Sequence, residues 1–311
     1  MLLVPDKERI TVIETPTVFV LGAGASVPFG FPTGFALSER VVVTTHEHSN
    51  GYKDLVRLGA DEGQLNTFRY AFMRSAFNSV DAFLERRTEL IDIGKLVMGF
   101  ILARHESNEE LFKFPGNWLR SLYDRIATVD FSDLRRNHVS FITFNYDRNV
   151  EHFLFDAIKN SYNKEPSAVR PVMQEHFPII HLHGRLGYLP WEGQVPENTH
   201  AYQGTLTRQS LRTCADNIKV IHEDTRGRDE DFRRAKHLVD SAEKIVFLGF
   251  GFNERNVSRL GVSDLPPGKA LAMVHTTKRV ALHRAQEATN NKIAFMPNDC
   301  DFFFEDRFHW R

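Results

Sequence analysis

The sequence predicts an α/β protein with a doubly wound, mainly parallel sheet. Short runs rich in β-branched and aromatic residues recur along the chain, and helical patterns follow several of them. Several runs are apolar almost throughout, which is typical of strands that helices cover on both faces. Strand, loop, helix and strand in succession indicate a Rossmann-like fold. The expected strands are 17–22, 138–144, 178–184, 244–250, 269–276 and 292–297.

One long interval departs from this alternation. Residues with mainly helical periodicity fill the chain between the first expected strand and the second. We therefore expect a single domain in which 10–35 and 137–311 form the Rossmann-like core and 36–136 form a helical insertion. Within the insertion, Ser79 is placed to cap a helix, and Asp81 then lies near the positive end of that helix.

Composition and charge argue against several classes of protein. The 311 residues carry a formal net charge of -1, which gives no general attraction to nucleic acid or to an anionic membrane. The apolar run at 96–103 is too short to cross a bilayer, and the charged first ten residues lack a signal-peptide core. We expect a cytoplasmic protein. Residues 160–243 are polar and contain several prolines, and they predict no definite structure.

The cysteine count excludes a four-cysteine zinc module. The chain has two cysteines, Cys214 and Cys300, which are far apart and in no CxxC pattern. His181 and His183 form a pair that suggests a metal, but no third ligand stands in a recognisable pattern with them. We therefore expect no metal.

A glycine-rich segment follows the first expected strand. Gly-Ala-Gly-Ala-Ser runs from Gly22 to Ser26, where small residues let backbone amides approach a diphosphate closely. The segment departs from the GxGxxG pattern, because Val27 stands where the third glycine belongs. A loop that merely ends a strand is the alternative interpretation.

Three further strand ends carry polar residues. Asn145 and Asp147 follow the second strand, where they either face a ligand crevice or cap the next helix. His181 and His183 are two residues apart on the third strand, so alternation places them on the same side. Either histidine suits proton transfer near neutral pH, or has a structural role. After the fourth strand, Asn253 can bind a ribose hydroxyl or cap a helix.

The order of these segments resembles the sirtuin superfamily, in which similar motifs surround NAD+. The matching motifs are GAGAS, TFNYD, HLHG and GFGFNE, and the resemblance covers roughly 17–34, 138–150, 178–184 and 244–276. The stretch at 79–85 also resembles the start of the helical region in bacterial sirtuin-like proteins.

Departures from the pattern of the protein deacylases limit the resemblance to one subgroup of the superfamily. Protein deacylases of this family usually carry a four-cysteine zinc module, which this chain cannot build. FPTG at 31–34 replaces their Pro-Asp-Phe-Arg stretch, and 185–193 has no counterpart of their peptide-pairing segment. The PTG and NYD forms occur in the sirtuin-like NAD+ hydrolases of bacterial antiphage defence, which this chain resembles most.

This resemblance implies an NAD+ glycohydrolase that releases nicotinamide and ADP-ribose, with NAD+ as its substrate. Asn145 is then expected to hold the ribose or the attacking water, and His183 to act as the general base. Asp147 is expected to bind the nicotinamide carboxamide. The other implied nucleotide-binding residues are Gly22, Ala23, Gly24, Ser26, Thr33, Gly249, Gly251, Asn253 and His275.

A toxic hydrolase has to be held inactive until it is needed. The resemblance therefore implies a homo-oligomer and a defence partner, such as an ATPase or an Argonaute-like protein. Two alternatives stay open: a module that senses NAD+ or ADP-ribose without turnover, and a protein deacylase or ADP-ribosyltransferase. The Asn145–His183 pair favours catalysis over sensing, and the missing zinc cysteines argue against the deacylase.

Overall fold

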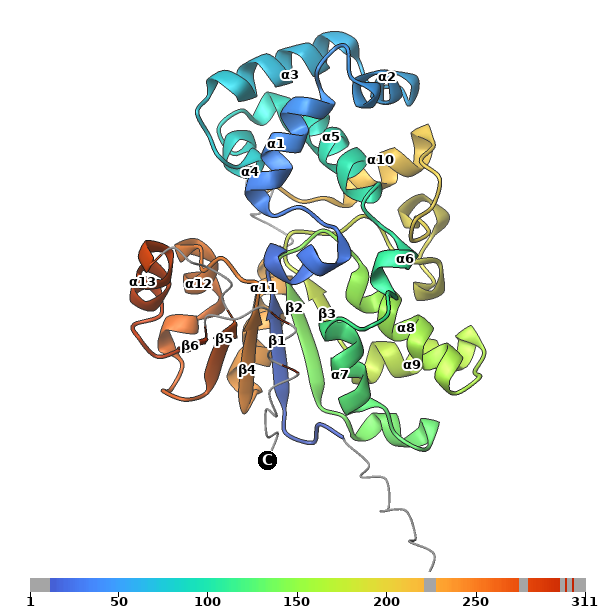
Figure 1. Cartoon of the computed structure of the whole chain (residues 1–311), viewed down its shortest axis with the longest axis vertical. Coiled ribbons are helices and arrows are strands. Elements are labelled where there is room, and N and C mark those ends of the chain that lie inside the picture. The colour runs from blue at the N-terminus through green and yellow to red at the C-terminus, as the bar shows by residue number, and fades with distance from the viewer. Residues whose placement is uncertain (1–11, 221–227, 274–278, 297–299, 301–303, 305–311) are drawn as a thin grey trace, which may run out of the picture.

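A six-stranded parallel sheet forms the centre of the protein, with the strand order β3-β2-β1-β4-β5-β6 (Figure 1). The structure is a computed structural model that describes residues 12–220, 228–273, 279–296, 300 and 304. The predicted fold class is confirmed, and each expected strand is present. The strands are β1 (Thr17–Leu21), β2 (Val139–Thr143), β3 (Ile179–His181), β4 (Lys244–Leu248), β5 (Ala270–Met273) and β6 (Ala294–Met296).

Helices cover both faces of the sheet, which explains the nearly continuous apolar strands. Phe19 and Leu21 of β1 belong to one hydrophobic cluster, and Val18 and Val20 belong to another on the opposite face. The first cluster includes side chains of α7 (Trp118–Ile126), α8 (Asn149–Ser161) and α9 (Pro166–His176). The second includes side chains of α11 (Arg228–Ser241), α12 (Glu254–Leu260) and α13 (Arg279–Ala288).

A group of helices lies beyond the carboxyl ends of the strands (Figure 1). Buried side chains of these helices join the same hydrophobic cluster as Phe19 and Leu21, so they pack continuously with one face of the sheet. The division into a core and an insertion stays a prediction. The group contains α1 (Gly34–Thr44), α2 (Asn50–Arg57), α3 (Glu62–Arg74), α4 (Val80–Leu84), α5 (Ile91–Ala103) and α10 (Arg208–Asn217).

Ser79 caps α4 as the sequence predicts, since its Oγ accepts a hydrogen bond from the N–H of Ala82 at 3.4 Å. The helical pattern that begins there is nevertheless interrupted. α4 ends at Leu84, the short 3-10 helix η2 (Thr88–Leu90) follows, and α5 begins at Ile91. Asp81 stands in the first turn of α4, and its carboxylate also accepts a hydrogen bond from Tyr146 in the segment after β2.

Three of the five prolines in 160–243 begin helices. Proline occupies the first turn of α9 and of two 3-10 helices, η4 (Pro190–Glu192) and η5 (Pro196–Asn198), where its missing N–H is not needed. The remaining short elements are α6 (Asn108–Leu111) and the 3-10 helices η1 (Ala23–Phe29), η3 (Phe131–Arg136) and η7 (Val262–Asp264).

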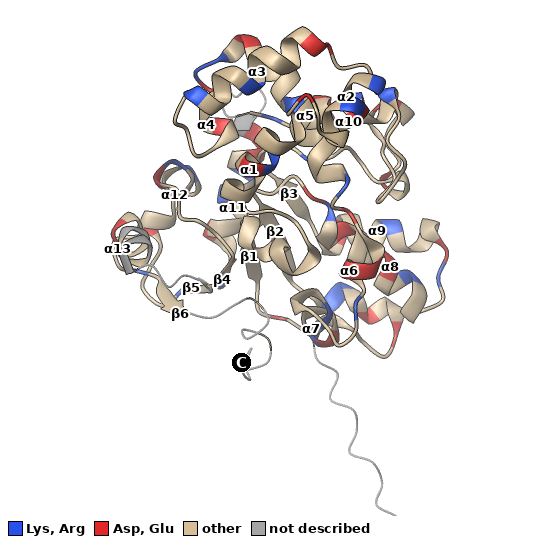
Figure 2. Ribbon diagram, turned by 45° about the horizontal axis from the view of Figure 1, so that its top comes forward, with Lys and Arg blue, Asp and Glu red and all other residues tan. Residues whose placement is uncertain are grey.

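Charged residues of both signs are mixed over the outer helices, whereas β1 and β2 carry none (Figure 2). Within the described ranges, no helix is both long enough and apolar enough to cross a membrane. This distribution agrees with the balanced charge of the sequence.

A fully buried ion pair connects the start of α8 to the segment between α5 and α6. Nη2 of Arg148 lies 2.7 Å from both carboxylate oxygens of Glu106, and neither side chain is exposed to solvent. Glu106 also accepts a hydrogen bond from the N–H of Gln203 at 3.0 Å, and Arg148 donates to the carbonyl oxygen of His200. Each charged group therefore has a counter-ion and a further hydrogen bond, as a buried ion pair requires.

We expect Glu106→Gln to lower the free energy of unfolding by about 3–5 kcal/mol, because it leaves the Arg148 charge buried without its counter-ion. Chemical denaturation measures the change. Arg136→Gln is the control, since the Arg136–Glu14 pair is exposed at the surface, and its loss should cost less than about 1 kcal/mol. Equal effects in the two variants would contradict the role of the buried pair.

Candidate functional site

The strand order brings two glycine-rich loops together at the carboxyl edge of the sheet. β1 and β4 are neighbours, but the chain continues from β1 toward β2 and from β4 toward β5, on opposite sides. The loops that follow β1 and β4 therefore flank the point where the topology switches direction. Ligands of doubly wound sheets bind at this kind of position.

The glycines at this point allow the two backbones to touch. The N–H groups of Gly22 and Gly24 donate to the carbonyl oxygens of Leu248 and Gly249, both at 3.0 Å. A Cβ atom on Gly24 would lie 2.8 Å from Gly249 Cα. These two N–H groups, which the sequence predicts near a diphosphate, are thus engaged within the protein. No described residue accepts a hydrogen bond from the N–H of Ala23, which lies between them.

A buried polar cluster fixes the first loop to the end of β2. Nδ2 of Asn145 donates to the carbonyl oxygen of Gly22 at 2.9 Å and to Oγ of Ser26 at 3.0 Å. Ser26 Oγ in turn donates to Oδ2 of Asp147 at 2.6 Å. Ser26, Asn145 and Asp147 are between 5% and 8% exposed. The structure therefore brings four of the predicted site residues, Gly22, Ser26, Asn145 and Asp147, into one hydrogen-bonded cluster.

The cluster leaves some hydrogen-bonding capacity unused. No donor among the described residues reaches Oδ1 of Asn145, so that oxygen can accept a hydrogen bond from a ligand. Oδ1 of Asp147 accepts the N–H of Asn149 at 3.3 Å. Burial raises the pKa of Asp147, while the hydrogen bonds from Ser26 and Asn149 oppose the shift.

The two histidines do not share a strand face, so that expectation is wrong. β3 ends at His181, and His183 lies in the turn that follows, where the alternation of a strand no longer applies. The ring of His181 is bonded to Glu151 Oε1 at 2.8 Å and to the carbonyl oxygen of Asn145 at 3.1 Å. The ring of His183 lies beside that of Phe144, with 5.4 Å between centroids.

The other predicted residues lie around the two loops. Thr33 caps α1 by accepting a hydrogen bond from the N–H of Ala36, and Asn253 caps α12 in the same way. Both caps are exposed, and neither bond excludes a further contact with a ligand. Gly251 has open space around it, since no atom lies within 4 Å of a Cβ built there. His275 lies outside the described residues.

α4 contacts both loop regions through residues to which the sequence assigns no such role. The hydroxyl of Tyr146 donates to Oδ1 of Asp81 at 2.6 Å. At the other end of α4, Glu85 pairs with Arg255, the second residue of α12, at 2.9 Å. Asp81 and Glu85 stand in the 79–85 stretch, where the sequence predicts a capped helix, but nothing in the sequence indicates their partners.

Glu151 and His181 belong to a second buried polar group. Glu151 also lies 3.4 Å from Arg185, which pairs with Glu192 at 2.9 Å. Burial alone would raise the pKa of Glu151, but the charge and hydrogen bond of His181, together with Arg185, outweigh it and lower the pKa to about 2. Among the described residues, no three His, Cys, Asp or Glu side chains gather as a metal site.

We expect Glu151→Gln to change how stability depends on pH. Because folding lowers the Glu151 pKa from its usual 4.5 to about 2, the ionised carboxylate stabilises the fold above pH 4.5. That contribution, on the order of 3 kcal/mol, is lost as the pH falls toward 2. Unfolding free energies measured from pH 7 to pH 2.5 should therefore converge for the wild type and the variant. A constant difference across this range would contradict the charge pairing.

We expect Gly249→Ala to destabilise the protein by about 2 kcal/mol or more, because it combines close contact with an unfavourable backbone conformation. Gly249 has φ of +57°, and a Cβ there would lie 2.0 Å from the backbone nitrogen of Ala25. Gly251→Ala is the matched control, since its Cβ meets no atom within 4 Å. Thermal melting compares the two variants, and equal melting temperatures would show that the loops do not need this close contact.

No protein-family model matches this chain, and no curated protein is similar enough to it to count as a relative. The resemblance to sirtuin-like proteins therefore stays a prediction that rests on the four strand-end motifs. Three residues of those motifs, Ser26, Asn145 and Asp147, are hydrogen-bonded to one another at the carboxyl edge of the sheet.

Proposed function

We propose that this protein is an NAD+ glycohydrolase that cleaves NAD+ into nicotinamide and ADP-ribose. The observation that carries the proposal is the buried Asn145–Ser26–Asp147 cluster beside the meeting point of the two glycine-rich loops. Such a meeting point is the usual ligand site of a doubly wound sheet. In this proposal NAD+ is the substrate, and the chemistry needs no metal.

Asn145 has the geometry of a preorganised hydrogen-bonding group. Cleavage of the bond between nicotinamide and ribose builds positive charge on the ribose, so the ribose and the incoming water have to be held in place. The contacts of Nδ2 with Gly22 and Ser26 fix the plane of the Asn145 amide. Its Oδ1 then accepts a hydrogen bond from a ribose hydroxyl or from the attacking water.

His183 and Asp147 supply the remaining roles. His183 lies beside Phe144, the residue before Asn145, and acts as the general base that takes a proton from water or a ribose hydroxyl. Asp147 is held by Ser26 and Asn149 and receives the amide of the nicotinamide on its remaining lone pairs. The N–H of Ala23 donates a hydrogen bond to the diphosphate, and the open space at Gly251 leaves room for the adenosine.

The proposed reaction also bears on the cellular role of the protein and on its regulation. An enzyme that depletes NAD+ harms its own cell, so its activity has to be controlled. We propose a cytoplasmic effector of antiphage defence that is regulated by homo-oligomerisation and by a partner such as an ATPase. The likeness of the four motifs to sirtuin-like defence proteins supports this part of the proposal.

We expect His183→Ala to reduce the release of nicotinamide by about 10²–10⁴-fold, because a positioned general base is removed. NAD+ affinity, measured by calorimetry, should change little. Asn145→Ala should lose turnover similarly, although it also removes the bonds that hold the first loop, so its melting temperature has to be measured. His176→Ala is the control, because His176 lines a pocket with Val139 and Ser140, which begin β2 at the amino edge of the sheet.

Each of three other outcomes would contradict a part of this proposal. Full activity in His183→Ala would refute the assignment of the base. NAD+ binding without nicotinamide release, even with a natural partner present, would favour the sensing module. Turnover that requires an acyl-lysine peptide would favour the deacylase.

A further inference from the structure

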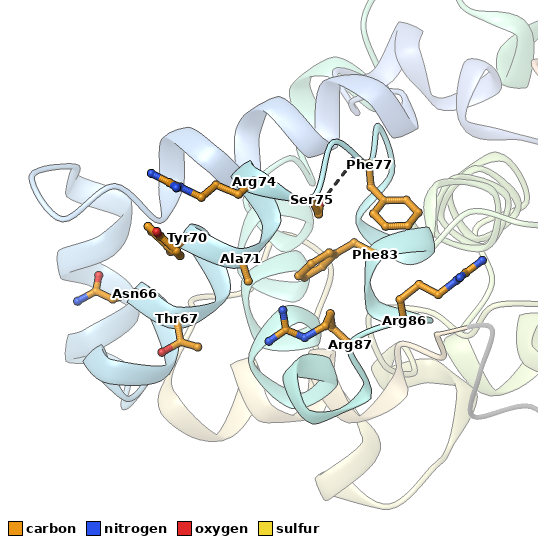
Figure 3. A pocket seen from close by; sticks show the side chains of 10 residues that line it. All are labelled: Asn66, Thr67, Tyr70, Ala71, Arg74, Ser75, Phe77, Phe83, Arg86 and Arg87. Atoms are coloured by element: carbon orange, nitrogen blue, oxygen red, sulfur yellow. Dashed lines mark hydrogen bonds between the residues drawn. The ribbon is translucent and has the colours of Figure 1, made fainter.

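A cavity of about 870 Å³ opens between α3 and the segment that contains α4 (Figure 3). Its volume lies in the range of about 300–1,000 Å³ that is typical of small-molecule sites. None of the residues predicted for the NAD+ site lines it. The cavity is lined by Asn66, Thr67, Tyr70, Ala71, Arg74, Ser75, Phe77, Phe83, Arg86 and Arg87.

Aromatic side chains form much of this cavity. Phe83 is buried at its base, with 6.5 Å between its ring centroid and that of Phe77. Tyr70 is 60% exposed and Phe77 is 39% exposed. Exposed aromatic rings around a hollow are characteristic of binding surfaces, because a flat ligand can cover them.

Guanidinium groups add positive charge to the same cavity. Arg74 lies over the ring of Tyr70, with 4.5 Å from its Cζ to the ring centroid. Arg87 points from the segment after α4 toward α3, whereas Arg86 points away from the other labelled side chains (Figure 3). Arg87 donates to Glu89 through Nε, and no described residue accepts a hydrogen bond from its two Nη groups.

Two nearby carboxylates are engaged by residues that do not line the cavity. Glu85 is paired with Arg255, and Asp81 accepts the hydroxyl hydrogen bond of Tyr146. Glu89 is thus the nearby carboxylate that competes for Arg87. Among the described lining residues there are three arginines and no acidic side chain, so an anion is the complementary ligand.

We propose that this cavity binds a nucleoside phosphate, at a site separate from that of NAD+. The base stacks against the exposed rings of Tyr70 and Phe77, and the phosphate binds Arg87 and Arg74. Asn66 and Thr67 stand on the same wall as Tyr70 and offer an amide and a hydroxyl to the edge of the base. The proposal combines the aromatic and the cationic parts of the lining in one ligand.

The test places a fluorescent reporter in the cavity. In Phe77→Trp, a base that stacks on the new indole should quench its fluorescence. The difference in quenching from the wild type, which has three native tryptophans, reports this cavity and does not depend on NAD+ hydrolysis. AMP is the probe, with adenosine and inorganic phosphate as separate arms. We expect saturable quenching by AMP, and binding about tenfold weaker for adenosine, which lacks the charge-assisted hydrogen bonds of the phosphate.

Charge variants in the Phe77→Trp background identify the phosphate contact. Arg87→Gln should weaken AMP binding about tenfold, and Glu89→Gln should tighten it a few-fold by removing the competing carboxylate. Arg57→Gln removes an equal charge from α2, outside this cavity, and should leave the affinity unchanged.

Three outcomes would overturn the proposal. The first is no quenching by millimolar AMP in a reporter variant that melts like the wild type. The second is equal affinity for AMP and adenosine. The third is an equal loss in Arg57→Gln and Arg87→Gln, which would mean that only the overall charge attracts the nucleotide.

Discussion

The side-chain amide of Asn145 is the contact on which the arrangement of the carboxyl edge depends. It joins the end of β2 to the loop after β1, because its Nδ2 reaches the carbonyl oxygen of Gly22 and the hydroxyl of Ser26. The hydroxyl of Ser26 donates a hydrogen bond to Asp147, so that three buried polar side chains are hydrogen-bonded to one another. On the other side, the same loop is held by backbone contact with Gly249. The loop is therefore fixed from both neighbouring strands by contacts within the protein, and fixed polar groups are what a preorganised site requires.

The residues after β2 together contact several different parts of the protein. Asn145 and Asp147 hold the glycine-rich loop, Tyr146 bonds to Asp81 of α4, and Arg148 pairs with Glu106 before α6. The hydroxyl of Tyr202 donates to Asn149. One short segment thus aligns the sheet, the helices beyond its carboxyl edge and the start of α8. A structural role and a catalytic role are compatible here, since a group held by several bonds also keeps a fixed orientation toward a ligand.

Local patterns predicted the fold well and the contacts of the site less well. The six strands could be recognised because strands buried on both faces read as apolar runs, and Ser79 could be recognised because an N-cap depends on nearby residues alone. The separate surroundings of His181 and His183 depend on where β3 ends, which no local pattern fixes. Glu106 and Arg148 are 42 positions apart, and only the fold brings them together. The glycines of the first loop follow β1 as the sequence predicts, but their close contact with Gly249 depends on which strands are neighbours.

α4 shows how the helices beyond the sheet are coupled to the candidate site. A helix of five residues has too few internal hydrogen bonds to be stable alone, so its tertiary contacts fix its position. Those contacts are the Tyr146–Asp81 hydrogen bond on one side and the Glu85–Arg255 pair on the other, and Phe83 between them forms the base of the cavity. A change in the position of α4 therefore alters the surroundings of both loops and of the cavity together. By linkage, a ligand that favours one position of α4 at the cavity changes the affinity at the loops, and a ligand at the loops changes the affinity of the cavity by the same factor.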